Sequence, residues 1–308
     1  MGRILFVTAA PPDGLAGGVK VVHRHAALLA GMGFDARVLA PRGRPVWFRS
    51  DAAVEGGARL RVDPDDVLVF GEEMDGSFAT SLRLPCRREL YCQNHHYLLH
   101  DRLGARSLTE AGFHRVYAAS RPIRDFLGTV MGVAGADVVA PPIDPALFRP
   151  ATKRLRIAFL PRKLPEQARF IQAVFRRRHP DLAFVEWLDL SNRHEEQVAE
   201  GLAGSALFLS LAHREGLGMM ALEAMACGCA VVGFHGMGGL EYATARNGRW
   251  FMTDEAMACA DALAEVARGL ERGDPAVAAM VEAGRATAAA YAPDAVRAQL
   301  RAHFGGGA

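Results

Sequence analysis

Two glutamates at a fixed spacing are the residues of this sequence best suited to chemistry. Glu215 and Glu223 lie eight positions apart, and the residues from Gly216 to Leu222 between them are uncharged. A carboxylate among small apolar residues is costly unless it gains hydrogen bonds, and sugar hydroxyls are donors of that kind. The alternative is structural, with Glu223 an acid of a helix N-terminus and Glu215 an acid of the surface. The spacing alone leaves both interpretations open.

The elements around these glutamates predict one βαβ unit of a parallel sheet. The apolar run 206–209 indicates a buried strand, residues 219–226 are strong helix formers, and residues 229–234 indicate a second short strand. Ligands of parallel sheets bind beyond the carboxyl ends of the strands, where Glu215 and the Gly238–Gly239 loop fall. Free amides at the start of the predicted helix favour a phosphate there.

This stretch resembles the signature of the family-4 glycosyltransferases, which are retaining enzymes with the GT-B fold. Their signature reads E-G-[FL]-G-x-x-x-L-E-A-M-A-x-G-x-P-V-V. It is matched here by Glu215-Gly216-Leu217-Gly218 and then by Leu222-Glu223-Ala224-Met225-Ala226-Cys227-Gly228-Cys229-Ala230-Val231-Val232. The sequence departs from the family pattern at two places, with Ala230 where proline is usual and Met219-Met220 where Leu-Pro is common.

The resemblance implies an α/β protein of the GT-B fold, with two Rossmann-like domains facing an interdomain cleft. We expect an acceptor-side domain at residues 1–150 and a nucleotide-sugar donor domain at 151–308, with a last helix, about 295–304, that packs back on the first domain. It further implies hexosyltransferase-like transfer from a nucleotide-diphosphate sugar, with retention at the anomeric carbon. Glu215 would hold a hydroxyl of the donor sugar, and Glu223 the ribose hydroxyls. The expected donor-binding residues are Glu223, Gly17, Gly18, Gly216, Leu217, Gly218, Met219, Gly238 and Gly239.

A pair of cations follows the first predicted strand of the second domain. That strand covers 156–160 and leads into Pro161, Arg162 and Lys163. Two cations at the carboxyl end of a strand suit a diphosphate, although a solvated turn is the alternative. Members of the family typically carry an arginine here and a lysine about five residues later. Arg162 fits the arginine, whereas Lys163 is adjacent to it, and both are candidates for stabilising the departing diphosphate.

A glycine loop opens the first domain. Gly17 and Gly18 lie between a strand predicted at 3–8 and a helix predicted at 19–31. The loop lacks the G-x-G-x-x-G pattern, which argues against a nicotinamide cofactor. Glycines entering a helix allow close backbone approach and leave free amides, although a plain turn is the alternative. The resemblance places such a loop at the cleft.

Two adjacent histidines follow a strand predicted at 89–93. His95 and His96, with His100 nearby, suggest a metal site, but no carboxylate completes a recognised metal motif. We therefore expect no metal and no other cofactor. A structural histidine is the alternative to a functional one. The resemblance makes His95 and His96 candidates for the acceptor side, and the sequence leaves the choice between them open.

The composition of the chain limits the classes of partner and the compartment that we expect. The chain has 308 residues, enough for two domains, and its net charge of +2 gives no reason to expect a nucleic acid. The five cysteines are dispersed and no secretory signal is recognisable, which favours reduced thiols in a cytoplasmic protein, or one peripheral on the inner face of the membrane. No apolar run is long enough to span a bilayer.

Several features stay open at this level, including the nucleotide base, the sugar, the linkage, the oligomeric state and the acceptor, whether glycan, lipid-linked or small molecule. The main rival function is a degenerate GT-B protein that binds a nucleotide sugar without transferring it, because the Arg162–Lys163 spacing departs from the family. An epimerase or a phosphorylase of the same fold is a second rival. A phosphorylase needs a pyridoxal-phosphate lysine, and the second domain carries few lysines.

Overall fold

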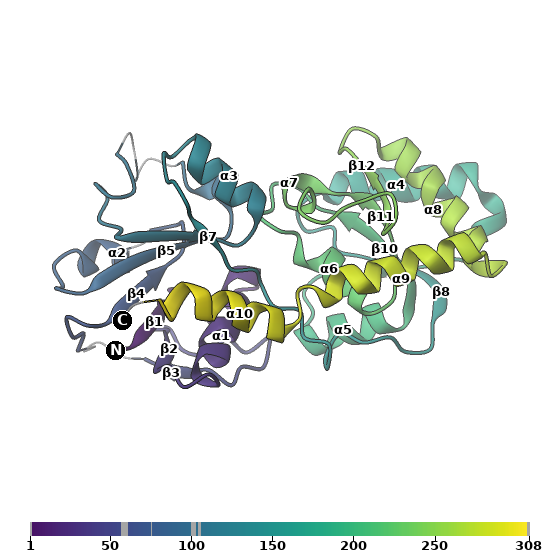
Figure 1. Ribbon diagram of the computed structural model, residues 1–308. Helices are drawn as coiled ribbons and strands as arrows, with labels where there is room; N and C mark the ends of the chain where they lie inside the picture. The colour runs from purple at the N-terminus through teal and green to yellow at the C-terminus, as the bar shows by residue number, and fades with distance from the viewer. Residues whose placement is uncertain (1, 57–60, 75, 100–102, 104–105, 307–308) are drawn as a thin grey trace. The chain divides into compact units, whose positions relative to one another are not determined.

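The computed structural model divides into two compact units, each built around its own parallel sheet (Figure 1). Unit 1 comprises Met1–Pro142 and Pro293–Ala308, and unit 2 comprises Ile143–Ala292. The predicted α/β architecture of two Rossmann-like domains is therefore confirmed. The residues that the structure describes are 2–56, 61–74, 76–99, 103 and 106–306.

Unit 1 contains a seven-stranded sheet in which every neighbouring pair of strands is parallel. Its strands are β1 (Ile4–Val7), β2 (Ala36–Leu39), β3 (Ala53–Glu55), β4 (Val67–Phe70), β5 (Arg87–Cys92), β6 (Arg115–Ala118) and β7 (Asp137–Val138). Their spatial order is β3-β2-β1-β4-β5-β6-β7, so the order reverses between β1 and β4. The loops after these two strands flank the switch point where such sheets bind ligands.

The helices of unit 1 place both predicted features of this domain at one edge of its sheet. Helix α1 (Gly17–Ala30) follows β1, so Gly17 and Gly18 form the first turn of this helix and not the loop that the sequence predicted, and the 3-10 helix η1 (His95–Tyr97) follows β5. The remaining helices that precede the crossing to unit 2 are α2 (Gly76–Ser81) and α3 (Arg121–Thr129). The glycine loop and the histidines therefore lie at the carboxyl ends of strands.

Unit 2 contains a five-stranded parallel sheet in the order β12-β11-β10-β8-β9. Its strands are β8 (Arg154–Phe159), β9 (Glu186–Asp189), β10 (Ser205–Leu211), β11 (Ala230–Phe234) and β12 (Arg249–Phe251). Its helices are α4 (Pro165–Arg178), η2 (Pro180–Leu182), α5 (Glu195–Ala203), α6 (Met219–Ala226), α7 (Gly236–Gly239), α8 (Ala256–Glu271) and α9 (Pro275–Ala289). The order reverses between β8 and β10, so the switch point lies between the strands that precede Arg162 and Glu215.

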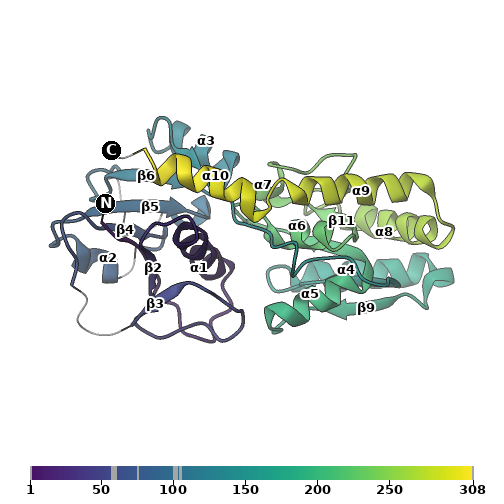
Figure 2. The same cartoon turned by 60° about the horizontal axis from the view of Figure 1, so that its bottom comes forward.

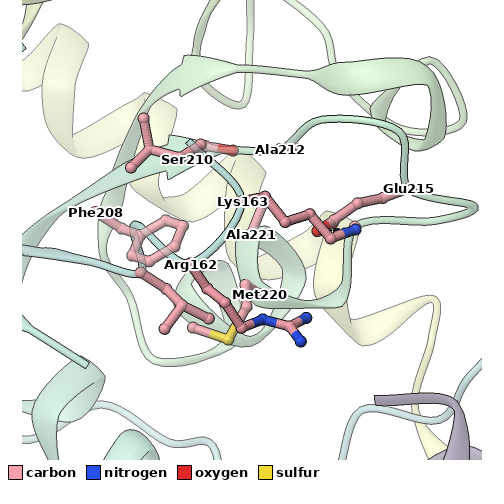
Figure 3. A pocket seen from close by; sticks show the side chains of 11 residues that line it. Arg162, Lys163, Phe208, Ser210, Ala212, Glu215, Met220 and Ala221 are labelled. Carbon is pink, nitrogen blue, oxygen red and sulfur yellow. Dashed lines mark ion pairs between the residues drawn. The ribbon is translucent and has the colours of Figure 1, made fainter. Parts of the chain in front are cut away.

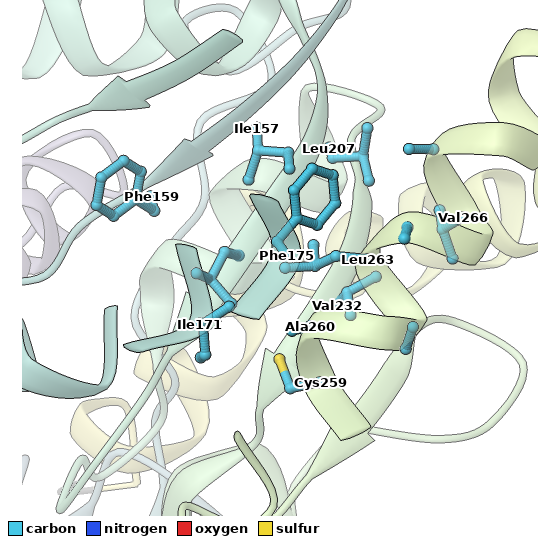
Figure 4. Packing of buried hydrophobic residues seen from close by; sticks show 14 of the residues in the cluster. Ile157, Phe159, Ile171, Phe175, Leu207, Val232, Cys259, Ala260, Leu263 and Val266 are labelled. Carbon is cyan, nitrogen blue, oxygen red and sulfur yellow. The ribbon is translucent and has the colours of Figure 1, made fainter. Parts of the chain in front are cut away.

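The core of unit 2 lies between the sheet and the helices α4 and α8. All residues of β10 and β11 are buried, as expected for strands covered on both faces. Figure 4 shows strand side chains packed with side chains of both helices, among them Ile157, Leu207, Val232, Ile171, Phe175, Ala260 and Leu263. Burial of this apolar surface fixes the sheet and thereby the strand ends that carry the polar loops.

The C-terminal helix α10 (Pro293–Phe304) belongs to unit 1, where it lies beside α1 (Figure 1, Figure 2). Its buried His303 lies between two carboxylates, with Nε2 2.8 Å from Oε2 of Glu89 and Nδ1 2.7 Å from Oδ2 of Asp137. Both ring nitrogens can donate only when the imidazole is protonated. Burial raises the pKa of Glu89, but the hydrogen bond and charge of His303 outweigh burial and leave that pKa below its usual value.

The variant His303→Gln tests this anchor. It removes the imidazole that contacts the buried carboxylate of Glu89, whose other oxygen still pairs with Arg87, and breaking a buried pair costs up to about 3–5 kcal/mol. We expect the free energy of unfolding in urea at neutral pH to fall by about that amount. The exposed Arg301→Gln on the same helix is the matched control.

The pH dependence of that loss has a definite sign. Because the pKa of Glu89 is lowered in the fold, its contribution is present above the usual glutamate pKa and is lost as the pH falls through the folded-state pKa. The stability difference between the wild type and His303→Gln should therefore shrink on acidification. Equal urea midpoints for the two proteins at neutral pH would contradict the anchor.

Candidate functional site

A pocket in unit 2 collects most of the charged residues that the sequence singled out. It lies at the carboxyl ends of β8 and β10 and at the start of α6 (Figure 3). Of the predicted residues, Arg162, Lys163, Glu215 and Gly218 line it. The other lining residues are Leu160, Phe208, Ser210, Leu211, Ala212, Met220 and Ala221.

Lys163 and Glu215 form an ion pair inside this pocket. Lys163 Nζ is 3.1 Å from Oε1 of Glu215, and each side chain is 26% exposed. The same ammonium donates a hydrogen bond to the carbonyl oxygen of His213 at 3.4 Å. Figure 3 shows the two side chains directed at each other, with Arg162 extending past Met220. Lys163 therefore orients the carboxylate and leaves part of its own charge available to a ligand.

The backbone between β10 and α6 is held in a conformation that aims the start of α6 into the pocket. Arg214 and Gly218 both have positive φ, of 47° and 80°, and Gly218 is the N-cap of the helix. The buried hydroxyl of Tyr242 donates to the carbonyl oxygen of Gly218 at 2.8 Å. The amides of the first turn of α6 therefore face the pocket beside the cations, where an anionic group is favoured.

The predicted residues just outside the pocket support its wall. Leu217 is buried, and a Cβ on Gly238 would lie 2.6 Å from the backbone nitrogen of Leu217. The two backbones therefore touch, and only glycine permits that approach. Gly238 and Gly239 do not form the loop expected from the sequence, since they belong to the short helix α7, Gly236–Gly239.

Three further donor-side predictions fall near the pocket without lining it. Met219 is the first residue of α6, and Gly216 is a buried residue of the preceding loop. Glu223 lies on α6 and is 2% exposed. A buried acid is costly unless it gains hydrogen bonds.

In unit 1, the glycine loop and the histidine turn are joined by one side chain. The amide of Gln93 donates through Nε2 to the carbonyl oxygen of Gly18 at 3.3 Å, and Gln93 immediately follows β5. Gly17 precedes Gly18 at the start of α1. The features predicted for the acceptor side therefore lie at neighbouring strand ends of one unit, whereas those predicted for the donor lie in unit 2.

The two histidines of η1 differ in exposure. His95 is 7% exposed, and its ring packs 4.8 Å from that of Phe126, whereas His96 is exposed. Burial lowers the pKa of His95, and the neighbouring His96 adds to this effect. Nδ1 of His95 is buried without a hydrogen-bond partner among the described residues. His100 lies outside the described residues.

Sequence reasoning missed Glu72, which follows β4 at the same edge of unit 1. It is 7% exposed, and its Oε2 accepts the backbone N–H of Gln93 at 3.0 Å. A glutamate two positions after the apolar run 67–70 was the available signal. No group of three or more metal-ligating side chains gathers in the described part of the chain. No helix among the described residues is long and apolar enough to cross a membrane.

The folds of solved glycosyltransferases match this architecture. Sucrose-phosphate synthase from Thermosynechococcus elongatus has a TM-score of 0.70 at 15% identity and covers 99% of this chain and 98% of its own. Anabaena HepE in complex with UDP and glucose has a TM-score of 0.69 at 14% identity, with 99% and 100% covered. A glycosyltransferase from Rickettsia africae gives 0.70 at 13%, with 99% and 97% covered. The two sheets and the pocket thus define a protein of the GT-B glycosyltransferase fold.

The sequence comparisons point to the same class of protein. Residues 187–287, which include the pocket loop and α6, match the family described as Glycosyl transferases group 1. An alpha-1,6-glucosyltransferase of Actinobacillus pleuropneumoniae serotype 7 (strain AP76) is 29% identical over 182 residues, which is 58% of this chain. The match spans about half of that relative, 55% of its length.

Gly218→Ala tests the geometry of the pocket loop. A side chain at φ 80° costs about 1–2 kcal/mol, and the new Cβ would also lie 3.1 Å from the hydroxyl of Tyr242. Gly273→Ala is the matched control, because Gly273 has φ 67° with no atom within 4 Å of the added Cβ. Urea unfolding should show a larger loss of unfolding free energy for Gly218→Ala than for Gly273→Ala. Equal losses would mean that the side chain of Tyr242 moves aside at no cost in free energy.

Proposed function

We propose that this protein is a retaining glycosyltransferase that moves a sugar from a nucleotide-diphosphate sugar to an acceptor, in glycan or glycoconjugate biosynthesis. The observation that carries the proposal is the pocket of unit 2, which places Glu215, Lys163 and Arg162 beside the first turn of α6. Cations and free amides suit a diphosphate, and a carboxylate beside them suits a sugar hydroxyl. Retention is supported by the resemblance to family 4.

UDP-glucose is the donor we favour. The solved Anabaena HepE structures hold UDP, UDP and glucose, or UDP-glucose, and the curated relative is an alpha-1,6-glucosyltransferase. In our proposal the diphosphate lies against Arg162 and the start of α6, the ribose reaches Glu223, and the glucose reaches Glu215. The acceptor binds at the edge of unit 1 that carries Gly17, Gly18 and the two histidines of η1, and its own identity stays open among glycan, lipid-linked and small-molecule alcohols.

The reaction needs positive charge where the nucleoside diphosphate departs. Arg162, Lys163 and the amides of the first turn of α6 supply it in a partly enclosed site, where such stabilisation is most effective. We therefore propose that turnover needs no divalent metal. Glu215 stabilises the positive charge that develops on the sugar ring as the glycosidic bond breaks.

The rival function is a nucleotide-sugar binder without transferase activity. It would need the same cations and the same α6 amides, so binding alone does not separate the two. Turnover is the measurement that distinguishes them.

Glu223→Gln and Glu223→Ala test the donor side. Losing a hydrogen bond from a charged group costs roughly 1.5–3 kcal/mol, so UDP affinity should fall on the order of tenfold to a hundredfold by calorimetry. Glu223→Gln keeps the shape of the buried side chain, and its melting temperature shows whether the fold is intact. Unchanged UDP affinity in a folded Glu223→Ala would rule out the ribose role.

Glu215→Gln tests turnover. The amide keeps the size of the side chain but removes the charge, so kcat for UDP-glucose with glucose as the acceptor probe should fall on the order of 100-fold. UDP affinity should stay nearly constant, because the contact acts in the transition state. The exposed Glu186→Gln in the same unit is the control.

The same assay decides between transferase and binder. It is run in EDTA, with UDP release measured for UDP-, GDP-, ADP- and dTDP-sugars. Loss of turnover in EDTA that magnesium or manganese restores would contradict the metal-free proposal. A wild type that binds a nucleotide sugar tightly and turns over none of these donors would make the binder the better description.

A further inference from the structure

The buried carboxylate of Glu72 connects the two features that we assign to the acceptor side, the glycines at the start of α1 and the histidines of η1. Glu72 follows β4 at the switch point of the unit 1 sheet, and its side chain is almost fully buried. Its Oε2 accepts the backbone N–H of Gln93, 3.0 Å away at the end of β5. The side chain of Gln93 in turn donates to the carbonyl oxygen of Gly18 at the start of α1. Glu72 thereby connects the segments after β4 and β5 with the start of α1.

Asn94, which follows Gln93 after the end of β5, extends this connection to the histidines. Asn94 accepts the backbone N–H of His96 through its side-chain oxygen at 3.2 Å and so caps η1. On the other side, a Cβ on Gly18 would lie 3.1 Å from Nε2 of Gln93, so the contact requires close approach at a glycine. A shift of Gln93 and Asn94 would therefore move both the glycine loop and the turn that carries His95.

Burial and hydrogen bonding act on the pKa of Glu72 in opposite directions. Burial favours the neutral acid and raises its pKa to about 7, while the backbone N–H groups of Gln93, Asn94 and Glu72 itself favour the carboxylate. Glu73 from the same loop raises this pKa further, and Tyr91 and Cys92 are the ionisable groups that face it from β5. Helix α1 carries the buried Lys20 two positions after Gly18.

We propose that Glu72 is a positioning residue for the acceptor, whose carboxylate holds the His95 turn and, through Gln93, the first turn of α1 at Gly17 and Gly18, and whose protonation loosens both. An ionised carboxyl group accepts several N–H donors, whereas the neutral acid presents one O–H that needs an acceptor of its own. The acceptor edge is therefore set in the ionised state. The consequence for catalysis rests on the proposed function, whereas the linkage between Glu72 and Gly18 does not.

The stability effect has the opposite sign to that of Glu89. Because the pKa of Glu72 is raised in the fold, the neutral acid stabilises the fold, and this contribution is lost as the pH rises through about 7. The ionised form of Glu72 thus orders the acceptor edge but lowers the stability of the fold. Such a trade-off is expected where a buried group serves a functional site and not the core.

Backbone amide NMR of the labelled protein tests the linkage directly. In the wild type, the amide signals of Gly18, Gln93 and Asn94 should shift together between about pH 5 and about pH 9, with one midpoint near 7. In Glu72→Gln this shared midpoint should vanish. Glu73→Gln, at the exposed neighbouring position, should retain it, moved slightly to lower pH because Glu73 raises the pKa of Glu72.

Two results would overturn the proposal. One is a wild type whose Gly18 and Gln93 signals share no midpoint, and the other is a shared midpoint that persists in Glu72→Gln. The titration of His95 is separable, because burial places its pKa below the ordinary histidine value. If Glu72→Gln fails to fold, Gln93→Ala cuts the same connection, and Gly18 should then stop following the midpoint that Asn94 still shows.

Enzyme kinetics test whether the connection between Glu72 and Gly18 affects acceptor binding. With UDP-glucose as donor and glucose as the acceptor probe, Glu72→Gln should raise KM for glucose about tenfold and leave UDP affinity unchanged. A variant that transfers with an unchanged KM for glucose would remove the positioning role. If the wild type transfers no glucose, the proposed function is at fault, and the NMR result still decides whether Glu72 controls Gly18.

Discussion

The pocket depends on backbone contact between two neighbouring strand–helix connections of unit 2. A Cβ on Gly233 of β11 would lie 2.2 Å from the carbonyl oxygen of Ser210 on β10, and a Cβ on Gly238 would reach the backbone of Leu217. Such contact leaves no room for a side chain, so glycine at both positions lets the segments around α6 lie directly against their neighbours. The left-handed turn at Gly218 then directs α6 and sets Glu215 opposite Lys163.

The sequence predicted the elements that follow strong patterns. Apolar runs of four and six residues, at 206–209 and 229–234, predicted β10 and β11, and a run of helix formers at 219–226 predicted α6 with the bounds that the structure shows. The prediction of the GT-B fold came from the match that begins at Glu215, which is a resemblance and not a physical derivation. The pairing of Lys163 with Glu215 could not be predicted, because they are distant in sequence and meet only where β8 lies beside β10.

Glu72 shows why part of a site escapes sequence reasoning. Near it the chain reads as an apolar strand followed by three acidic residues, Glu72, Glu73 and, outside the described part of the structure, Asp75, which resembles a solvated turn. Only the sheet order, with β4 between β1 and β5, buries the first of these acids beneath Gln93 and leaves Glu73 exposed. Burial depends on the tertiary structure, so two adjacent residues of the same type can differ in exposure and therefore in chemistry.

Three glutamates in this chain show how surroundings divide structural from functional acids. Glu89 meets His303 in the core, where burial is outweighed by a charged partner, and the pair fastens a helix. Glu215 is partly exposed and faces Lys163 in a pocket, so a ligand can compete for both members. Glu72 accepts backbone N–H groups, among them that of Gln93 at a switch point of the unit 1 sheet. Burial raises its pKa to about 7, so its charge changes near neutral pH, whereas the pKa of Glu89 is lowered, and this makes Glu72 suited to tune a site.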